Sequence, residues 1–243
     1  MKITSKTTIG EIAANDFRTA AIFTKYNIDF CCKGHRTIEE VCKKRDIPEA
    51  VLIEKLEEAK TQAANQSFDY KSWPLDLLTD YIIKTHHRYI KEKTPVLLQY
   101  LHKLCNVYGE TFPELFEIYK IFKASSLDLE EHMEKEERVM FPFIIQMKRA
   151  QSKGFSVETT PFGSIENQVI MMKEEHAAEG QRFRKIAALT NNYVPPAEAC
   201  NTYKAAFSML EDFEMNLHKH IHMENNILFP KAIMLEKNFE QVP

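Results

Sequence analysis

The feature that most restricts the fold is a short pattern that occurs twice, His132 to Pro142 and His220 to Pro230, 88 positions apart. Both copies read H-x-x-x-E-x-x-apolar-apolar-F-P. On a helix, residues four apart lie on one face about one turn apart, so the imidazole and the carboxylate can reach the same point. This spacing is typical of two metal ligands, although a single such pair is more often a solvated helix contact.

Both pairs fall on apolar helical stripes, which argues against solvation. Steps of three and four residues meet Leu115, Ile118, Phe122, Ser125, Leu129, His132, Glu136, Val139 and Phe143 in the first copy, and Leu210, Phe213, Leu217, His220, Glu224 and Ile227 in the second. A carboxylate and an imidazole in an apolar seam must be paired, hydrogen-bonded or metal-bound, because an isolated buried charge is too costly. We therefore expect both pairs to face a core.

Two more helical segments each contribute one inward histidine. The apolar stripe of the segment that follows Trp73-Pro74 contains His87, whereas the face of His86 runs into Lys93, so we select His87. The stripe of the segment that follows Ser164 contains His176. No further histidine lies on these stripes.

The intervals between these histidines are nearly equal, with 45 residues from His87 to His132 and 44 from His176 to His220. In antiparallel helices, equal intervals bring the second histidine back to the level of the first. This predicts an all-α protein with an up-down four-helix bundle and all six groups in one layer. Four histidines and two carboxylates suit two bridged metal ions, and iron, manganese and zinc all accept such ligands.

Composition narrows the class of protein and its partners. The 243 residues carry a formal net charge of −3, which gives no basic surface for a nucleic acid. The chain starts without an apolar signal segment and contains no run of about 18 apolar residues, so no membrane partner is expected. Five cysteines, an odd number, fit a reducing compartment. We expect a cytoplasmic protein.

The chain divides into a small helical module (residues 1–62), a linker (63–72) and the bundle (73–243). In the module, Thr8-x-x-Glu11 and Thr37-x-x-Glu40 read as capping boxes. A third helix is expected to open near Pro48 and to run to about Ala64. The linker segment lacks apolar periodicity.

Two adjacent cysteines, Cys31 and Cys32, follow Tyr26-Asn-Ile-Asp-Phe30 in the module. Adjacent cysteines share one zinc ion less easily than a C-x-x-C pair, and a vicinal disulfide closes a strained ring. Thiol or redox chemistry is one interpretation. The other is that two partly buried thiols fill a small core.

Two carboxylates lie beside the expected ligands. Asp128 precedes His132 by one turn, and Glu175 precedes His176 by one residue. They could orient the ligands or carry protons near them, and the alternative is simple surface solvation.

The order H…HxxxE…H…HxxxE resembles the hemerythrin-like di-iron domains. Together with Tyr26-Asn-Ile-Asp-Phe-Cys-Cys-Lys-Gly34, His132-Met-Glu-Lys-Glu-Glu137 and Glu224-Asn-Asn-Ile-Leu-Phe-Pro230, it is similar to the iron–sulfur cluster repair di-iron proteins of bacteria over nearly the whole chain. The resemblance implies two non-haem iron ions with an oxo or hydroxo bridge, bound by His87, His132, His176 and His220 and bridged by Glu136 and Glu224. Cys31 and Cys32 match the cysteine pair of that family. Two departures are Asp128, where relatives can have Glu, and a longer segment at 147–163.

The resemblance also implies a function. Such proteins act in recovery of iron–sulfur enzymes damaged by nitric oxide or peroxide, by supplying iron or reacting with nitric oxide. Damaged iron–sulfur proteins are the implied partners, with nitric oxide or oxygen as small ligands. Whether nitric oxide is turned over, in a reductase-type activity, or only bound stays open. So does a homodimer, because the sequence is silent on oligomeric state.

Two other functions compete with repair. A reversible oxygen carrier or sensor of the hemerythrin type resembles this pattern, but it uses a fifth histidine in a single-domain chain, and a Cys-Cys module has no obvious use there. In a metal-free helical interaction protein, the core histidines would be satisfied by the glutamates alone. Metal analysis separates the last interpretation from the other two.

Overall fold

A computed structural model describes residues 1–61, 69–153 and 163–240 of the chain. These residues form helices and loops without a named strand, and an isolated β-bridge joins Thr8 and Thr37, which confirms the all-α class. The chain separates into two compact units, Met1–Leu78 with Ile221–Pro243, and Thr79–His220. Within the described ranges, no helix combines the length and the apolar character needed to cross a membrane.

The first unit begins with the predicted helical module. Its helices are α1 (Ile9–Asn15), η1 (Phe17–Thr19), α2 (Ala20–Lys25), α3 (Ile38–Arg45) and α4 (Glu49–Thr61). The Thr8 hydroxyl accepts a hydrogen bond from the Glu11 amide, and Thr37 and Glu40 form a reciprocal capping box, as predicted. Residues 62–68, which include most of the expected linker and the expected end of the third helix, lie outside the described residues. The segment that follows forms the short turn η2 (Tyr70–Ser72).

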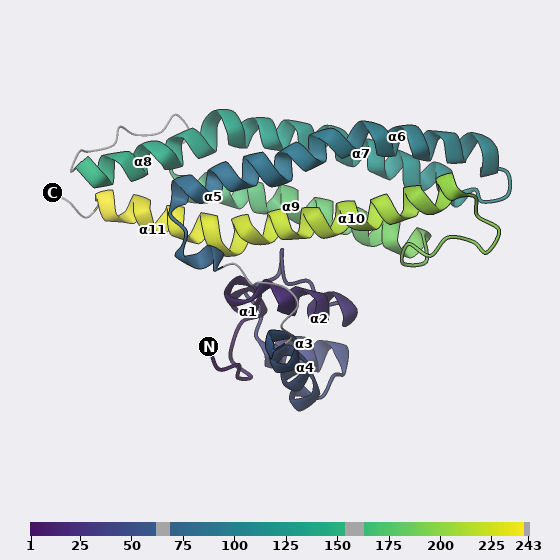
Figure 1. The fold of residues 1–243 in the computed structure, drawn as a ribbon. Coiled ribbons are helices and arrows are strands. Elements are labelled where there is room, and N and C mark those ends of the chain that lie inside the picture. The colour runs from purple at the N-terminus through teal and green to yellow at the C-terminus, as the bar shows by residue number, and fades with distance from the viewer. Residues whose placement is uncertain (62–68, 154–162, 241–243) are drawn as a thin grey trace. The chain divides into compact units, whose positions relative to one another are not determined.

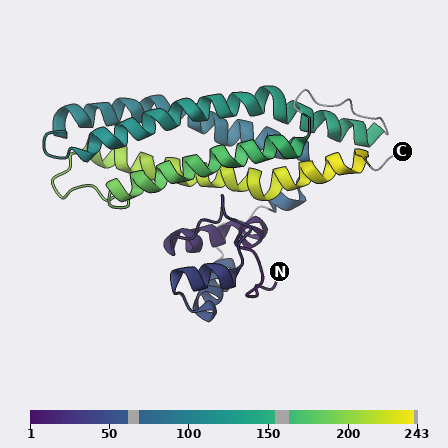
Figure 2. The same cartoon turned by 180° about the vertical axis from the view of Figure 1, so that it is seen from behind.

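Four long helical segments carry the expected ligands. Those parts of them that lie in the second unit run side by side in alternating directions (Figures 1 and 2). They comprise α5 (Leu75–Tyr81), η3 (Ile82–His87) and α6 (Arg88–Tyr108); α7 (Glu114–Lys135), η4 (Glu136–Met140) and α8 (Phe141–Lys153); α9 (Ile165–Leu189); and α10 (Asn201–Met223), η5 (Glu224–Leu228) and α11 (Phe229–Glu240). The Ser164 hydroxyl caps α9, as expected. Residues 154–162, within the segment noted as long, are outside the described residues.

An aromatic layer holds three of these helices together inside the second unit. The rings of Phe122 on α7 and Phe183 on α9 lie 5.2 and 5.6 Å from the ring of Phe213 on α10. All three side chains are fully buried. Edge-to-face and stacked aromatic pairs at such distances stabilise a core beyond simple area burial. This layer fixes the helices that carry His132, His176 and His220.

Three of the four long segments contain a π-helical turn, which the periodicity did not predict. In η4 and η5 the amides of Phe141 and Phe229 donate to the carbonyls of Glu136 and Glu224, five residues back. Pro142 and Pro230 follow directly, and proline has no N–H to donate to the carbonyl four residues earlier. The F-P dipeptide of the repeated motif therefore favours the wide turn, and π turns are frequent at functional sites.

The extra residue in a π turn shifts the inward face by one position. Val139, expected inside, is 46% exposed, whereas the next residues, Met140 and Phe141, are buried. In η3, steps of four back from His87 predict Ile83 inside, but Ile82 is buried and Ile83 is partly exposed. Around Pro230 the chain stays helical, because α10, η5 and α11 follow one another without a break. Helix α6 continues through Pro95, although a proline inside a helix removes one backbone hydrogen bond.

Candidate metal centre

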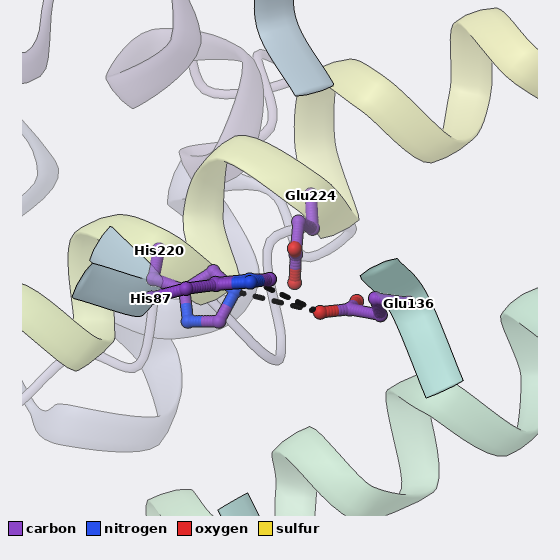
Figure 3. Close-up of side chains that lie close together, drawn as sticks. All are labelled: His87, Glu136, His220 and Glu224. Atoms are coloured by element: carbon purple, nitrogen blue, oxygen red, sulfur yellow. Dashed lines mark ion pairs between the residues drawn. The ribbon is translucent and has the colours of Figure 1, made fainter. Parts of the chain in front are cut away.

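Two overlapping groups of buried His and Glu side chains meet the distance requirement for a metal site. In the first, one ligand atom from each of His87, Glu136, His220 and Glu224 lies within 4.8 Å of the others. Figure 3 shows these four side chains converging from three helical segments. The second group contains His132, Glu136, His176 and Glu224. Together the groups contain all six residues predicted from the sequence.

Glu136 lies between the two groups. Its Oε1 is 3.3 Å from His132 Nε2, and its Oε2 is 3.3 Å from His87 Nε2 and 3.9 Å from His220 Nε2. His176 Nε2 lies 3.0 Å from His132 Nε2. One carboxylate therefore turns one oxygen to each group, as a carboxylate that bridges two metal ions must do.

The π turns bring the glutamates to this position. Glu136 and Glu224 are each the first residue of a π turn, one turn after His132 and His220 on the same continuous helix. Both carboxylates are fully buried.

Two histidines are oriented by carboxylates outside the cluster. His87 Nδ1 donates to Glu137 Oε1 at 2.8 Å, and His132 Nδ1 donates to Glu175 Oε2 at 2.6 Å. The donated Nδ1 proton leaves the Nε2 lone pair to face the cluster, which is the arrangement that prepares an imidazole to bind a metal. Of the alternatives considered for Glu175, this contact favours the orientation of a ligand.

The same contacts affect the pKa values of both carboxyls. The hydrogen bond from His132, aided by Lys135, lowers the pKa of Glu175 to about 2. Burial raises the pKa of Glu137, but hydrogen bonds from Lys91 and His87 outweigh burial and lower it. Both carboxyls are therefore ionised at neutral pH and can accept from an imidazole.

Glu137 has a role that helical geometry concealed. Helical geometry alone places Glu137 on a different face from His132, which would make it dispensable for metal binding. In the structure it contacts His87, which belongs to a different helix, and it also accepts from Lys91 at 2.7 Å. We therefore expect Glu137→Ala to lower the affinity for metal.

Replacing Glu175 by glutamine is expected to weaken metal binding about 10- to 100-fold, the usual effect of losing such an orienting partner. The amide keeps the size of the carboxylate but loses the charge that holds the His132 Nδ1 proton. Competition with a chelator of known affinity measures the change. Glu174→Gln, at the exposed neighbouring position, is the matched control and should bind like the unmodified protein. Equal affinity of the two variants would contradict the assigned role.

A pocket of about 210 Å³ reaches the cluster from the α7 and α9 side, and its lining includes both His132 and His176. Asp128, Lys135 and Glu179 also line it. Asp128 is 59% exposed at its side chain and pairs with Arg182 rather than with a ligand histidine. Burial raises the pKa of Glu179 despite hydrogen bonds from Ser125 and Arg182.

Two further histidines are buried, contrary to the expectation that no other histidine faces inward. His86 is 1% exposed because the π turn η3 turns it inside together with His87. Its ring stacks 5.9 Å from that of His220, and its Nδ1 lies 3.1 Å from Asn216 Oδ1. His222 is also 1% exposed and packs against Phe17 and Phe30 within the first unit. Neither belongs to the two ligand groups.

The cysteine pair lies in the loop between α2 and α3. Cys31 is 3% exposed and Cys32 is half-buried, and no disulfide joins them. The interaction with Cys32, together with burial, raises the pKa of the Cys31 thiol well above its ordinary value. Lys33 and Arg36 lie close in sequence, and positive charges nearby usually lower the pKa of a thiol. They do not offset the rise in the pKa of Cys31.

The donor set itself fits a transition-metal centre. Neutral imidazoles and carboxylates suit iron, manganese or zinc, whereas an all-oxygen site would suit calcium or magnesium. Burial, followed by the neighbouring His87, holds the pKa of His220 well below its ordinary value, so its imidazole is neutral and ready to bind. The two glutamates supply negative charge that a cation offsets in a dry core.

Comparison with known proteins gives matches for both parts of the chain. Residues 5–60 match the domain of unknown function DUF542 (ScdA_N), and residues 78–232 match the hemerythrin HHE cation binding domain. The iron-sulfur cluster repair protein YtfE of Musicola paradisiaca (strain Ech703) is 31% identical over 225 residues, which cover 93% of this chain and 95% of that protein. The iron-sulfur cluster repair protein ScdA of Staphylococcus haemolyticus (strain JCSC1435) is 29% identical over 230 residues, 94% of this chain and 99% of that protein.

Proposed function

Because this chain belongs to the family of iron–sulfur cluster repair proteins with a hemerythrin HHE cation-binding domain, we propose that it repairs clusters damaged by oxidative or nitrosative stress. The observation that carries the proposal is the pairing of a buried His/Glu cluster with the cysteine module, in a chain whose relatives match over both parts. In the proposed domain division, residues 1–62 form the cysteine module, residues 63–72 the linker and residues 73–243 the hemerythrin-like domain.

The proposed centre contains two iron ions. His87 and His220 would hold one ion, His132 and His176 the other, and Glu136 and Glu224 would bridge them. The support is the set of Nε2 and carboxylate atoms within 4.8 Å of one another in each group, with Glu136 and Glu224 common to both. Bound iron would supply exchangeable metal ions and a redox-active site for nitric oxide or oxygen.

The side chains around the centre would keep it accessible but ordered. Glu137 and Glu175 hold two of the imidazoles through their Nδ1 protons. The pocket along α7 and α9 exposes the edge of His132 and His176 to small molecules. Its carboxylates, Asp128 and Glu179, are balanced by Arg182, which contacts both. A site of this kind admits a small ligand from one side and excludes bulk water from the other ligands.

Repair is favoured over reversible oxygen carriage. The curated relatives that match both parts of the chain are named as repair proteins. An oxygen carrier also has no use for the cysteine module at residues 5–60. The buried His86 does not restore the carrier pattern, because its Nδ1 faces Asn216 and it is absent from both ligand groups.

The test is reactivation of a [4Fe–4S] hydro-lyase inactivated with nitric oxide. The purified chain should restore its activity, and the double change Cys31→Ser with Cys32→Ser should reduce the initial rate at least about tenfold while leaving the iron bound in the bundle and its visible spectrum unchanged. The reason is that the cysteines lie in the module and contribute no ligand atom to the His/Glu groups. Recovery of hydro-lyase activity and iron per chain are measured on the same preparations.

Cys200→Ser, at the exposed cysteine that precedes α10, is the matched control and should repair normally. No reactivation by the iron-loaded chain would reject the proposed function. Full repair by the double variant, or loss of iron from its bundle, would reject the role given to the cysteine module.

A further inference from the structure

Another set of candidate metal ligands, separate from the two His/Glu groups, lies in the N-terminal module. Ligand atoms of Asp29, Cys31 and Cys32 are within 4.8 Å of one another. Cys31 Sγ is 3.7 Å from Cys32 Sγ and 3.5 Å from Asp29 Oδ1. The Cys32 amide donates to Asp29 Oδ1 at 3.0 Å, which fixes the carboxylate against the turn. No residue of this group takes part in the His/Glu cluster.

The sulfur spacing matches that of two thiolates on one ion. Two sulfurs about 2.3 Å from a tetrahedral metal are about 3.8 Å apart, close to the 3.7 Å between Cys31 and Cys32. Adjacent side chains of an extended chain point to opposite sides. Here the backbone bends at residues 31–33, so both sulfurs reach the same side. The bend removes the objection to adjacent cysteines as joint ligands.

The surroundings hold this turn in place. The Cys31 carbonyl accepts hydrogen bonds from the side-chain amides of Asn225 at 3.2 Å and Asn226 at 3.3 Å, both within the same unit. Gly34 allows the close approach, because a Cβ there would lie 2.3 Å from Asn226 Oδ1. The turn is therefore largely organised before any ion binds, which lowers the cost of binding.

Charge explains why a cation would be taken. Two thiolates and one carboxylate within a few ångströms repel one another, and a divalent cation offsets that repulsion. Cys31 is buried, which strengthens its interaction with a bound ion, whereas Cys32 and Asp29 are partly exposed and give access from solvent. Three protein ligands leave a fourth position open for water or another ligand, whereas structural sites are closed by four protein ligands.

We propose that Asp29, Cys31 and Cys32 form a second metal site, which binds one divalent cation that accepts thiolate ligands, such as iron(II) or zinc(II). On binding, each thiol transfers its proton to solvent and its sulfur bonds to the ion, with no change of oxidation state. Its use as a holding place for iron in transit rests on the proposed function. The binding itself does not.

The experiment uses full-length, reduced protein whose bundle has been loaded with iron, titrated with cobalt(II) without oxygen. A thiolate-to-cobalt charge-transfer absorption should grow and saturate at one equivalent. His and Glu ligands give no such band, so cobalt in the bundle does not interfere. Cys31→Ser or Cys32→Ser should abolish the two-thiolate band, and Asp29→Asn should weaken cobalt binding at least about tenfold, as expected for loss of one charged ligand. Cys200→Ser should change nothing.

Absence of a saturating band in the unmodified protein would overturn the inference, as would a full band in the double Cys31→Ser, Cys32→Ser variant. Conversion of the pair to a disulfide in place of cobalt binding under these conditions would overturn it as well. Cys32 is partly exposed and Asp29→Asn is isosteric, so these two variants answer the question even if Cys31→Ser folds poorly. Because no iron–sulfur client is present, failure of repair counts only against the proposed function, and failure of cobalt binding only against this site.

Discussion

Glu136→Ala is expected to abolish stable metal binding, with a fall in affinity greater than the roughly 100-fold that loss of an orienting residue can cause. Glu136 places one oxygen 3.3 Å from His132 Nε2 and the other 3.3 Å from His87 Nε2, so its removal affects both ligand groups at once. The one carboxylate that remains, Glu224, cannot offset the charge of two divalent cations in a dry core. Iron per chain after desalting measures the effect.

Glu134→Ala is the matched control for this change. Glu134 lies on the same helix two residues earlier, is exposed, and pairs with Arg138 at the surface. Such surface pairs contribute about 0–1 kcal/mol, so this variant should keep its iron and its melting temperature. Equal iron in the Glu136→Ala variant and the control would show that Glu136 is not a shared ligand.

Removal of iron is expected to lower the melting temperature by about 5–10 °C for each ion lost, when free iron stands about 100-fold above its dissociation constant. Binding to the folded chain alone contributes about 2.7 kcal/mol under those conditions. One kcal/mol corresponds to about 2–4 °C for a chain of 150–250 residues. Six buried polar ligands make the folded state the one that binds. Calorimetry before and after chelation gives the shift.

The Glu136→Ala variant supplies the control for this second experiment, because chelator should leave its melting temperature unchanged. A fall of equal size in that variant would mean that the chelator acts on the protein in some other way. An unchanged melting temperature in unmodified protein shown to be free of metal would contradict the coupling of metal binding to stability.

Local periodicity was sufficient to select the six candidate ligands. On α9, the one long segment without a π turn, every position of the predicted stripe from Ile165 through His176 to Ile186 is buried. The nearly equal intervals between histidines also predicted that the four imidazoles would meet. The first signal needs only the repeat of the α-helix and the cost of burying a charge alone, and the second needs only the number of residues between two successive helices.

Periodicity failed at His222 because that side chain packs against Phe17 and Phe30. The other failures, at Val139 and His86, adjoin a π turn. Val139 is exposed, and His86 is buried beside His87, because one extra residue per turn changes the phase of everything that follows. The F-P dipeptide marks two of these turns but does not reveal their length. Whether a helix widens there depends on packing against its neighbours.

The sequence by itself determined the helical class, the repeated HxxxE motif and the residues that face the bundle core, because helical repeat and polarity act within one segment. Only the tertiary structure decided that Glu137 orients His87, that Glu175 orients His132, and that a bend brings the two cysteine sulfurs to 3.7 Å. Each of these contacts joins different helices or depends on the path of a loop. A hydrogen bond of this kind is set by the distance between elements, and no pattern along one helix encodes that distance.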